Sequence, residues 1–117
     1  MIIKSQRLKE AILAALADKE MVKILDCVMY NPKPVNDIIK ENNIPHTTTY
    51  RKIKWLVEER LLVIDKMEIT EEGRKISLFR STLKSINIKY EYNRVIIEAE
   101  QNINIMRKTA ERFFSLD

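Results

Sequence analysis

The 117-residue sequence predicts a single α+β domain that is mainly α, with helices in its first half and strands in its second half. Two changes of pattern support this fold class. Apolar residues recur at helical spacing up to about residue 59, whereas the segment from about 61 to 100 is rich in β-branched residues and tends to alternate. The last segment, about 102–116, returns to helical spacing.

Two capped helices are expected at the start of the chain. Ser5 can cap a first helix, roughly 6–17, and Asp18 can cap a second helix over 19–30. The apolar stripe of the first helix consists of Leu8, Ile12, Ala15 and Leu16. Apolar residues also occupy other faces of this helix, which is more surface than a small domain needs to cover.

The segment Asn31-Pro32-Lys33-Pro34 ends the second helix, because its prolines lack an N–H donor and disfavour helical geometry in the preceding residue. A short helix follows over about 36–42, with Asn36 as its cap. It stops at Asn42-Asn43, since asparagine accepts the left-handed conformation usually given to glycine. A longer helix then runs over about 47–59, capped by Thr47.

The segment LLVIDKMEI, residues 61–69, predicts a strand, and RKISLFRST, residues 74–82, predicts its partner. The turn TEEG between them places the single glycine, Gly73, where a positive φ is needed. An alternative stays open, in which a helix starts at Thr70 and a shorter hairpin turns at Asp65-Lys66. We favour the longer hairpin because its second strand leads directly into another strand.

A second hairpin is predicted over 84–99, with Asn93 at its turn. Alternation between residues 85 and 92 is strict, and it predicts four inward side chains, Ile86, Ile88, Tyr90 and Tyr92. The helix expected over 102–116 carries an apolar stripe of Ile103, Met106, Ala110, Phe113 and Phe114. We therefore predict a symmetric homodimer through the segments 1–17 and 100–117, unless the last helix only covers its own sheet.

Several function classes are disfavoured by composition. The chain has one cysteine (Cys27), one histidine (His46) and one glycine, so it offers no internal disulfide, no His/Cys zinc site and no glycine-rich phosphate loop. No catalytic constellation is visible, and we expect a protein that is not an enzyme and uses no cofactor or metal. The sequence contains no run of 18 apolar residues, so we expect a cytoplasmic protein without a membrane partner.

The distribution of charge suggests a polyanionic partner. The net charge is +4, and the isoelectric point is about 9.2. Residues 44–57 contain three basic side chains and no acid, and residues 74–90 contain five basic side chains and no acid. Residues 65–72 are predominantly acidic instead.

The predicted order of short helix, turn, longer helix and hairpin is that of a helix-turn-helix followed by a wing. Residues 47–56, TTTYRKIKWL, and residues 69–82, ITEEGRKISLFRST, carry a more specific likeness. Over about 18–82 the chain resembles the winged helix-turn-helix of archaeal and bacterial regulators of the ArsR-like class. Asn43 and Thr49 stand where those regulators commonly have glycine and valine, and the Cys-x-Cys metal-sensing motif is absent, so the resemblance implies no metal sensing.

The longer helix lacks an acid in its first turn, which favours contact between this helix end and an anion. Thr47 can cap the helix, Thr48 can approach a base edge, and Arg51 can contact guanine O6 and N7. Tyr50 and Lys54 suit phosphate oxygens. The full set of predicted DNA-contact residues is His46, Thr47, Thr48, Tyr50, Arg51, Lys52, Lys54, Arg74 and Lys75.

We therefore expect a sequence-specific regulator of transcription that binds double-stranded DNA as a homodimer, and the resemblance implies an archaeal source. The two copies would contact half-sites about one DNA turn, roughly 34 Å, apart. Two alternatives remain open. One is an architectural protein of the same fold that coats DNA without sequence preference, and the other is a winged helix that binds a protein partner.

Overall fold

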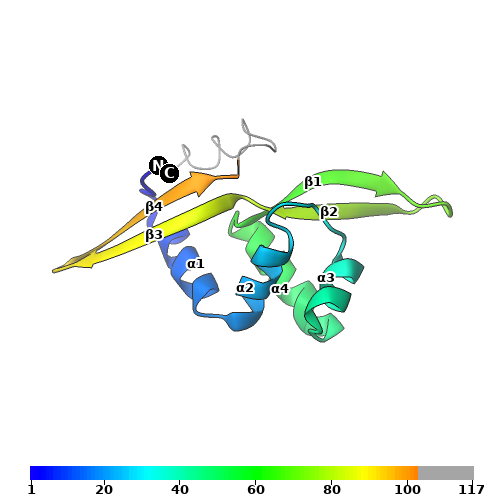
Figure 1. Ribbon diagram of the computed structural model, residues 1–117, viewed down its shortest axis with the longest axis horizontal. Coiled ribbons are helices and arrows are strands. Elements are labelled where there is room, and N and C mark those ends of the chain that lie inside the picture. Colours follow the sequence, from blue (N-terminus) through cyan, green and yellow to red (C-terminus); the bar gives the residue numbers. More distant parts are fainter. Residues whose placement is uncertain (103–117) are drawn as a thin grey trace.

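The computed structural model describes residues 1–102, which form four helices followed by two antiparallel β-hairpins (Figure 1). The α+β class and the order of helices before strands are confirmed. Only the first residue of the helix expected over 102–116 is among the described residues. Most of the predicted dimerisation segment 100–117 also lies outside them. The elements are α1 (Gln6–Leu16), α2 (Lys19–Cys27), α3 (Val35–Asn42), α4 (His46–Glu58), β1 (Leu62–Ile69), β2 (Lys75–Ser81), β3 (Leu83–Glu91) and β4 (Arg94–Gln101).

The caps of the first two helices are those that the sequence predicts. The Ser5 hydroxyl accepts the N–H of Leu8 at 3.1 Å, and the Asp18 carboxylate accepts two N–H groups at the start of α2, at 2.9 and 3.0 Å. However, α2 ends at Cys27 rather than near residue 30. The backbone turns there towards β2, and the carbonyl of Val28 accepts the N–H of Ser81.

The predicted caps of the next two helices are wrong. α3 and α4 begin one residue earlier, at Val35 and His46, and the capping positions belong to Pro34 and Pro45, without any side-chain cap. A proline has no N–H of its own to satisfy, and its carbonyl starts the helical ladder. The carbonyl of Pro45, for example, accepts the N–H of Thr49 at 2.9 Å. The end of α3 is as predicted, with Asn43 in the left-handed conformation (φ 52°).

The hydrophobic core lies between the helices and one face of the two hairpins, where the helices sit side by side (Figure 1). Its fully buried side chains come from helices and strands alike: Ile12, Ile24, Val28, Ile38, Leu56, Leu62 and Ile97. The two hairpins meet at Ser81–Leu83. At this junction the buried hydroxyls of Ser81 and Thr82 donate to the carbonyls of Leu25 and Arg60, at 2.6 and 2.8 Å. These two bonds tie the junction to the helical layer.

The first hairpin is the longer of the two forms that the sequence allowed. β1 pairs with β2 from Leu62–Ser81 to Ile69–Lys75, and the turn contains Gly73 at φ 83°. The alternative turn at Asp65-Lys66 is wrong. Asp65 instead marks a shift of register in β1, a bulge that bends the strand while the pairing continues on both sides.

The second hairpin confirms the predicted strands, but only part of the predicted burial. Ile86 is half-buried, whereas Ile88, Tyr90 and Tyr92 are 43%, 79% and 90% exposed. The prediction that these three side chains face a core is therefore wrong for the described chain. The hairpin projects past α1, so this helix covers its outer half only in part (Figure 1).

Candidate nucleic-acid interface

The orientation of α4 is fixed by the side chains that it buries, which are Thr49, Lys52, Ile53 and Leu56. Leu56 has no exposed surface and belongs to the core cluster. Thr49 is equally buried, and its hydroxyl donates to the carbonyl of Pro45 at 3.0 Å. Thr49 therefore packs in the interior and does not belong to the exposed face. With this face buried, the opposite face of the same helix must be exposed.

The exposed face of α4 carries four of the predicted DNA-contact residues, Thr47, Tyr50, Arg51 and Lys54, at spacings of three and four. We call these four residues the α4 outer face. Within residues 1–102, neither Arg51 nor Lys54 has an ion-pair partner. Their charges are thus not neutralised by neighbouring acids in the described structure.

The N-terminal end of α4 is chemically open. No side chain caps it, and its first turn contains no acid. His46 and Thr47 are exposed there, while Thr48 is half-buried. Free N–H groups and the positive end of the helix dipole make such an end favourable for an anion.

Lys52 is not part of this exposed face. It is 8% exposed, and its ammonium lies 2.6 Å from Oδ2 of Asp18, the cap of α2, and 3.0 Å from Oε1 of Glu20 in the first turn of α2. Contrary to its inclusion among the DNA-contact residues, Lys52 is not placed to contact DNA, because its charge is already paired and turned inward. Its burial could have been inferred from the sequence, because Lys52 lies three residues after Thr49 and four before Leu56, on the same face of the helix.

This ion pair predicts a pH-dependent contribution to stability. The hydrogen bond from Lys52, followed by the N–H of Met21, lowers the pKa of Asp18 below 3.8. The hydrogen bond to Asp18 raises the pKa of Lys52 above 10.5. The pair therefore stabilises the fold between about pH 4 and about pH 10 and is lost outside that window.

We expect Lys52→Met to lower the free energy of unfolding by about 1 kcal/mol at pH 7, a value that allows for partial solvent screening of the carboxylates. The difference from the parent chain should shrink as the pH falls through the lowered pKa of Asp18. Urea unfolding at pH 7 and at a series of pH values reaching well below 3.8 measures both quantities. A difference that stays constant across this pH series would contradict the assigned pair.

The hairpin β1–β2 brings two further predicted residues to the same side of the molecule. Arg74 and Lys75 line a cleft of 260 Å³ together with Tyr50 of α4 and Asn36 at the start of α3. The hairpin is held over α3 by an antiparallel bridge, in which Lys33 and Phe79 exchange N–H···O bonds of 2.9 and 3.1 Å. Asn36, which the sequence suggested only as a cap, is an additional polar group at this cleft.

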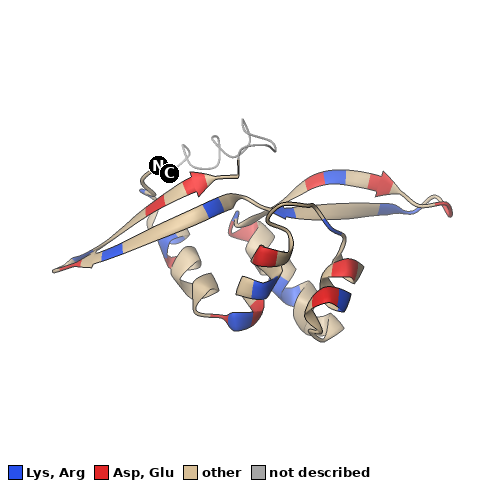
Figure 2. Cartoon of the chain, viewed as in Figure 1, with Lys and Arg blue, Asp and Glu red and all other residues tan. Residues whose placement is uncertain are grey.

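The tip of this hairpin is acidic. Glu71 and Glu72 are exposed in its turn, and they form the acidic end visible in Figure 2. A phosphate near the tip would be repelled by these carboxylates, whereas Arg74 and Lys75, just behind it, would attract one. The arrangement therefore favours an anion at the cleft over an anion at the tip.

Residues 1–102 show neither a metal-binding cluster nor a membrane-spanning helix. They contain no group of three His, Cys, Asp or Glu side chains placed to hold a metal ion. None of the helices in this range is long and apolar enough to cross a membrane. Cys27 is half-buried, and its sulfur lies 3.7 Å from the Lys33 ammonium, which itself pairs with Glu41 at 2.6 Å.

Comparison of the chain with models of known protein families and with curated proteins finds no match.

Proposed function

We propose that this protein binds double-stranded DNA through a winged helix-turn-helix, in which α3 and α4 form the helix pair and β1–β2 is the wing. The observation that carries the proposal is the α4 outer face, which is exposed, basic and free of acids in its first turn. Such a helix end can enter the major groove while its surroundings contact phosphates.

The proposed contacts follow from side-chain chemistry. Arg51 presents a planar fork of donors that matches guanine O6 and N7, and Thr48 is small enough to approach a thymine methyl. Lys54 and Tyr50 suit phosphate oxygens, which position the protein without specifying sequence. Arg74 and Lys75 would bind DNA phosphates at the cleft beside Tyr50.

We further propose a cytoplasmic regulator of transcription that acts as a homodimer. The segments α1 and 100–117 would form its contact surface, and Leu13 and Leu16 on α1 are 39% and 41% exposed in the described chain. Exposed apolar residues that gather on one surface favour an interface with another chain. Sedimentation analysis of the full chain measures this directly.

The decisive experiment for DNA binding is selection of bound fragments from random double-stranded DNA, followed by competition. A sequence-specific regulator should enrich one motif, and that motif should outcompete random DNA by at least about 10³-fold. Equal competition would support an architectural protein of the same fold. Failure to retain any DNA at low salt would contradict both forms of the proposal.

Lys54 supplies a second test. Lys54→Ala should weaken binding to all sequences alike and lower the slope of log K against log salt by about one unit, because one phosphate contact is lost. Titrations at several salt concentrations measure the slope. Lys23→Ala is the matched control, since it removes an exposed lysine from α2, away from the α4 outer face. An equal change of slope in both variants would contradict a specific role for Lys54.

A second candidate function, binding of a protein partner, is favoured by the tip of β1–β2. Met67 and Ile69 are 54% and 70% exposed there, beside the acidic residues Glu68, Glu71 and Glu72. A mixed apolar and acidic surface suits a basic protein partner better than DNA. This function would be supported if the chain retained a protein partner after nuclease treatment. Ile69→Asp should abolish that retention, and Arg51→Ala should leave it unchanged.

A further inference from the structure

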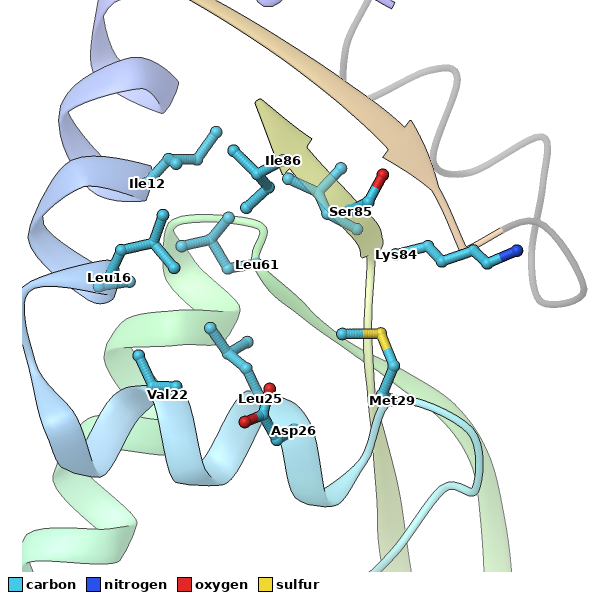
Figure 3. Close-up of a pocket in the computed structure, with 12 residues that line it drawn as sticks. Ile12, Leu16, Val22, Leu25, Asp26, Met29, Leu61, Lys84, Ser85 and Ile86 are labelled. Atoms are coloured by element: carbon cyan, nitrogen blue, oxygen red, sulfur yellow. The ribbon is translucent and has the colours of Figure 1, made fainter. Parts of the chain in front are cut away.

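A second hollow lies away from α4, between α1, α2 and the start of β3 (Figure 3). Its volume is 220 Å³. Most of its lining is apolar, and the side chains of Ile12, Leu16, Val22, Leu25, Met29 and Ile86 converge on it. This is a hydrophobic groove with no described segment lying in it.

Exposed apolar side chains also lie beyond this groove, on α1 and β3. Leu13 of α1 and Tyr90 of β3 line another hollow nearer the hairpin tip, and Ile88 lies between Ile86 and Tyr90 on the same face of β3. We call this surface, from Met29 to Tyr90, the α1–β3 trough. Polar side chains, among them Gln6 and Lys9, also line the hollow at Tyr90. Exposed apolar side chains that gather along one surface are typically covered in the functional protein.

The described chain ends beside one end of the trough. Asn102 is 8% exposed, and its side-chain amide donates to the carbonyls of Met29 and Ser81 at 2.6 and 3.0 Å. Its N–H donates to the carbonyl of Thr82 at 2.8 Å. The described chain therefore ends next to Met29, which lines the groove.

The segment 103–117 has the length and pattern to fill the trough. Its apolar residues, Ile103, Met106, Ala110, Phe113 and Phe114, recur at helical spacing, with charged residues such as Lys108 and Arg112 on the other side. As a helix, 15 residues would span about 22 Å. The β3 residues from Lys84 to Tyr90 span about 20 Å, which is a close match.

We propose that the segment 103–117 docks as an amphipathic helix in the α1–β3 trough of its own chain. Ile103 and Met106 would occupy the groove near Met29, and Phe113 and Phe114 would lie towards Tyr90. Docking within the chain is favoured because Asn102 holds the start of the segment beside the groove, which gives it a high effective concentration there. This inference does not depend on DNA binding, and it is an alternative to the homodimer contact proposed above, because the docked segment would cover Leu13 and Leu16 within its own chain.

Disulfide trapping in the full-length chain tests the docking. In a Cys27→Ser background, Leu16→Cys and Met106→Cys together should form a disulfide within one chain under mild oxidation, detected as loss of both thiols at monomer mass. The control pairs Met106→Cys with Asn87→Cys, which lies on the opposite face of β3 from Ile86 and should stay unlinked. A covalent dimer would place the segment on a second copy, and free thiols would leave the trough uncovered; either result overturns the proposal.

A second measurement does not need a disulfide to form. With Leu16→Cys alone in the Cys27→Ser background, the thiol should react slowly with a maleimide. Adding Met106→Asp should speed labelling by about tenfold or more, because the docked segment would be released. Lys108→Asp, on the charged side of the segment, should leave the rate unchanged. Equal labelling of all three chains would overturn the docking.

Discussion

Arg51→Ala should weaken binding to the selected DNA site by about 1–3 kcal/mol, roughly 5- to 150-fold, and relax the preference at one base pair. Arg51 is exposed on the α4 outer face, and no acid neutralises it within the described residues. It lies one turn after Thr47, close enough to the open end of α4 to contact a base edge. Loss of its donor fork would leave the guanine acceptors without a partner.

The measurement is a titration of the selected site and of variants with each base pair changed in turn. The parent chain should discriminate strongly at one position, and Arg51→Ala should be nearly indifferent there. Arg51→Lys is a useful second variant, because it keeps the positive charge but lacks the planar pair of donors. It should keep the part of the affinity that comes from charge attraction to phosphate and lose the preference for one base pair. If Arg51→Ala weakened binding equally for all base-pair variants of the site, Arg51 would contact the DNA phosphate backbone and not a base.

The exposed face of α4 could be predicted from the sequence because it depends on a single helix and its period. Once Ile53 and Leu56 face the core, Tyr50, Arg51 and Lys54 must face outwards. Lys52 was assigned wrongly for a different reason. Its partners, Asp18 and Glu20, are more than 30 residues away, and single-sequence patterns do not show which distant acids meet a lysine.

The hairpins also show that tertiary contacts cannot be predicted from local sequence patterns. Alternation over 85–92 correctly predicted a strand, because alternation is a property of the strand itself. It could not predict burial, which depends on how far α1 extends beneath the hairpin, and Tyr90 is therefore exposed. The cleft between Tyr50, Arg74 and Asn36 likewise depends on the tertiary bridge between Lys33 and Phe79.

Leu56→Ala should lower the free energy of unfolding by about 2–5 kcal/mol, the largest stability effect expected on α4. Leu56 has no exposed surface and packs in the core with Ile12 and Ile24, so truncation leaves a cavity that its neighbours fill only in part. Lys54→Ala, on the opposite face of the same helix, should change stability by no more than about 0.5 kcal/mol.

Urea unfolding at one fixed protein concentration measures both variants, since a dimer would make the midpoint depend on concentration. The denaturant slope should be unchanged in each, so that the shift in midpoint reports stability alone.

The contrast between the variants also separates effects on folding from effects on DNA binding. Leu56→Ala should reduce DNA binding only to the extent that it reduces the folded population, whereas Arg51→Ala should reduce it in a fully folded chain. Equal destabilisation by Leu56→Ala and Lys54→Ala would mean that the buried and exposed faces of α4 are wrongly assigned, and the proposed contact of Arg51 with DNA would lose its structural basis.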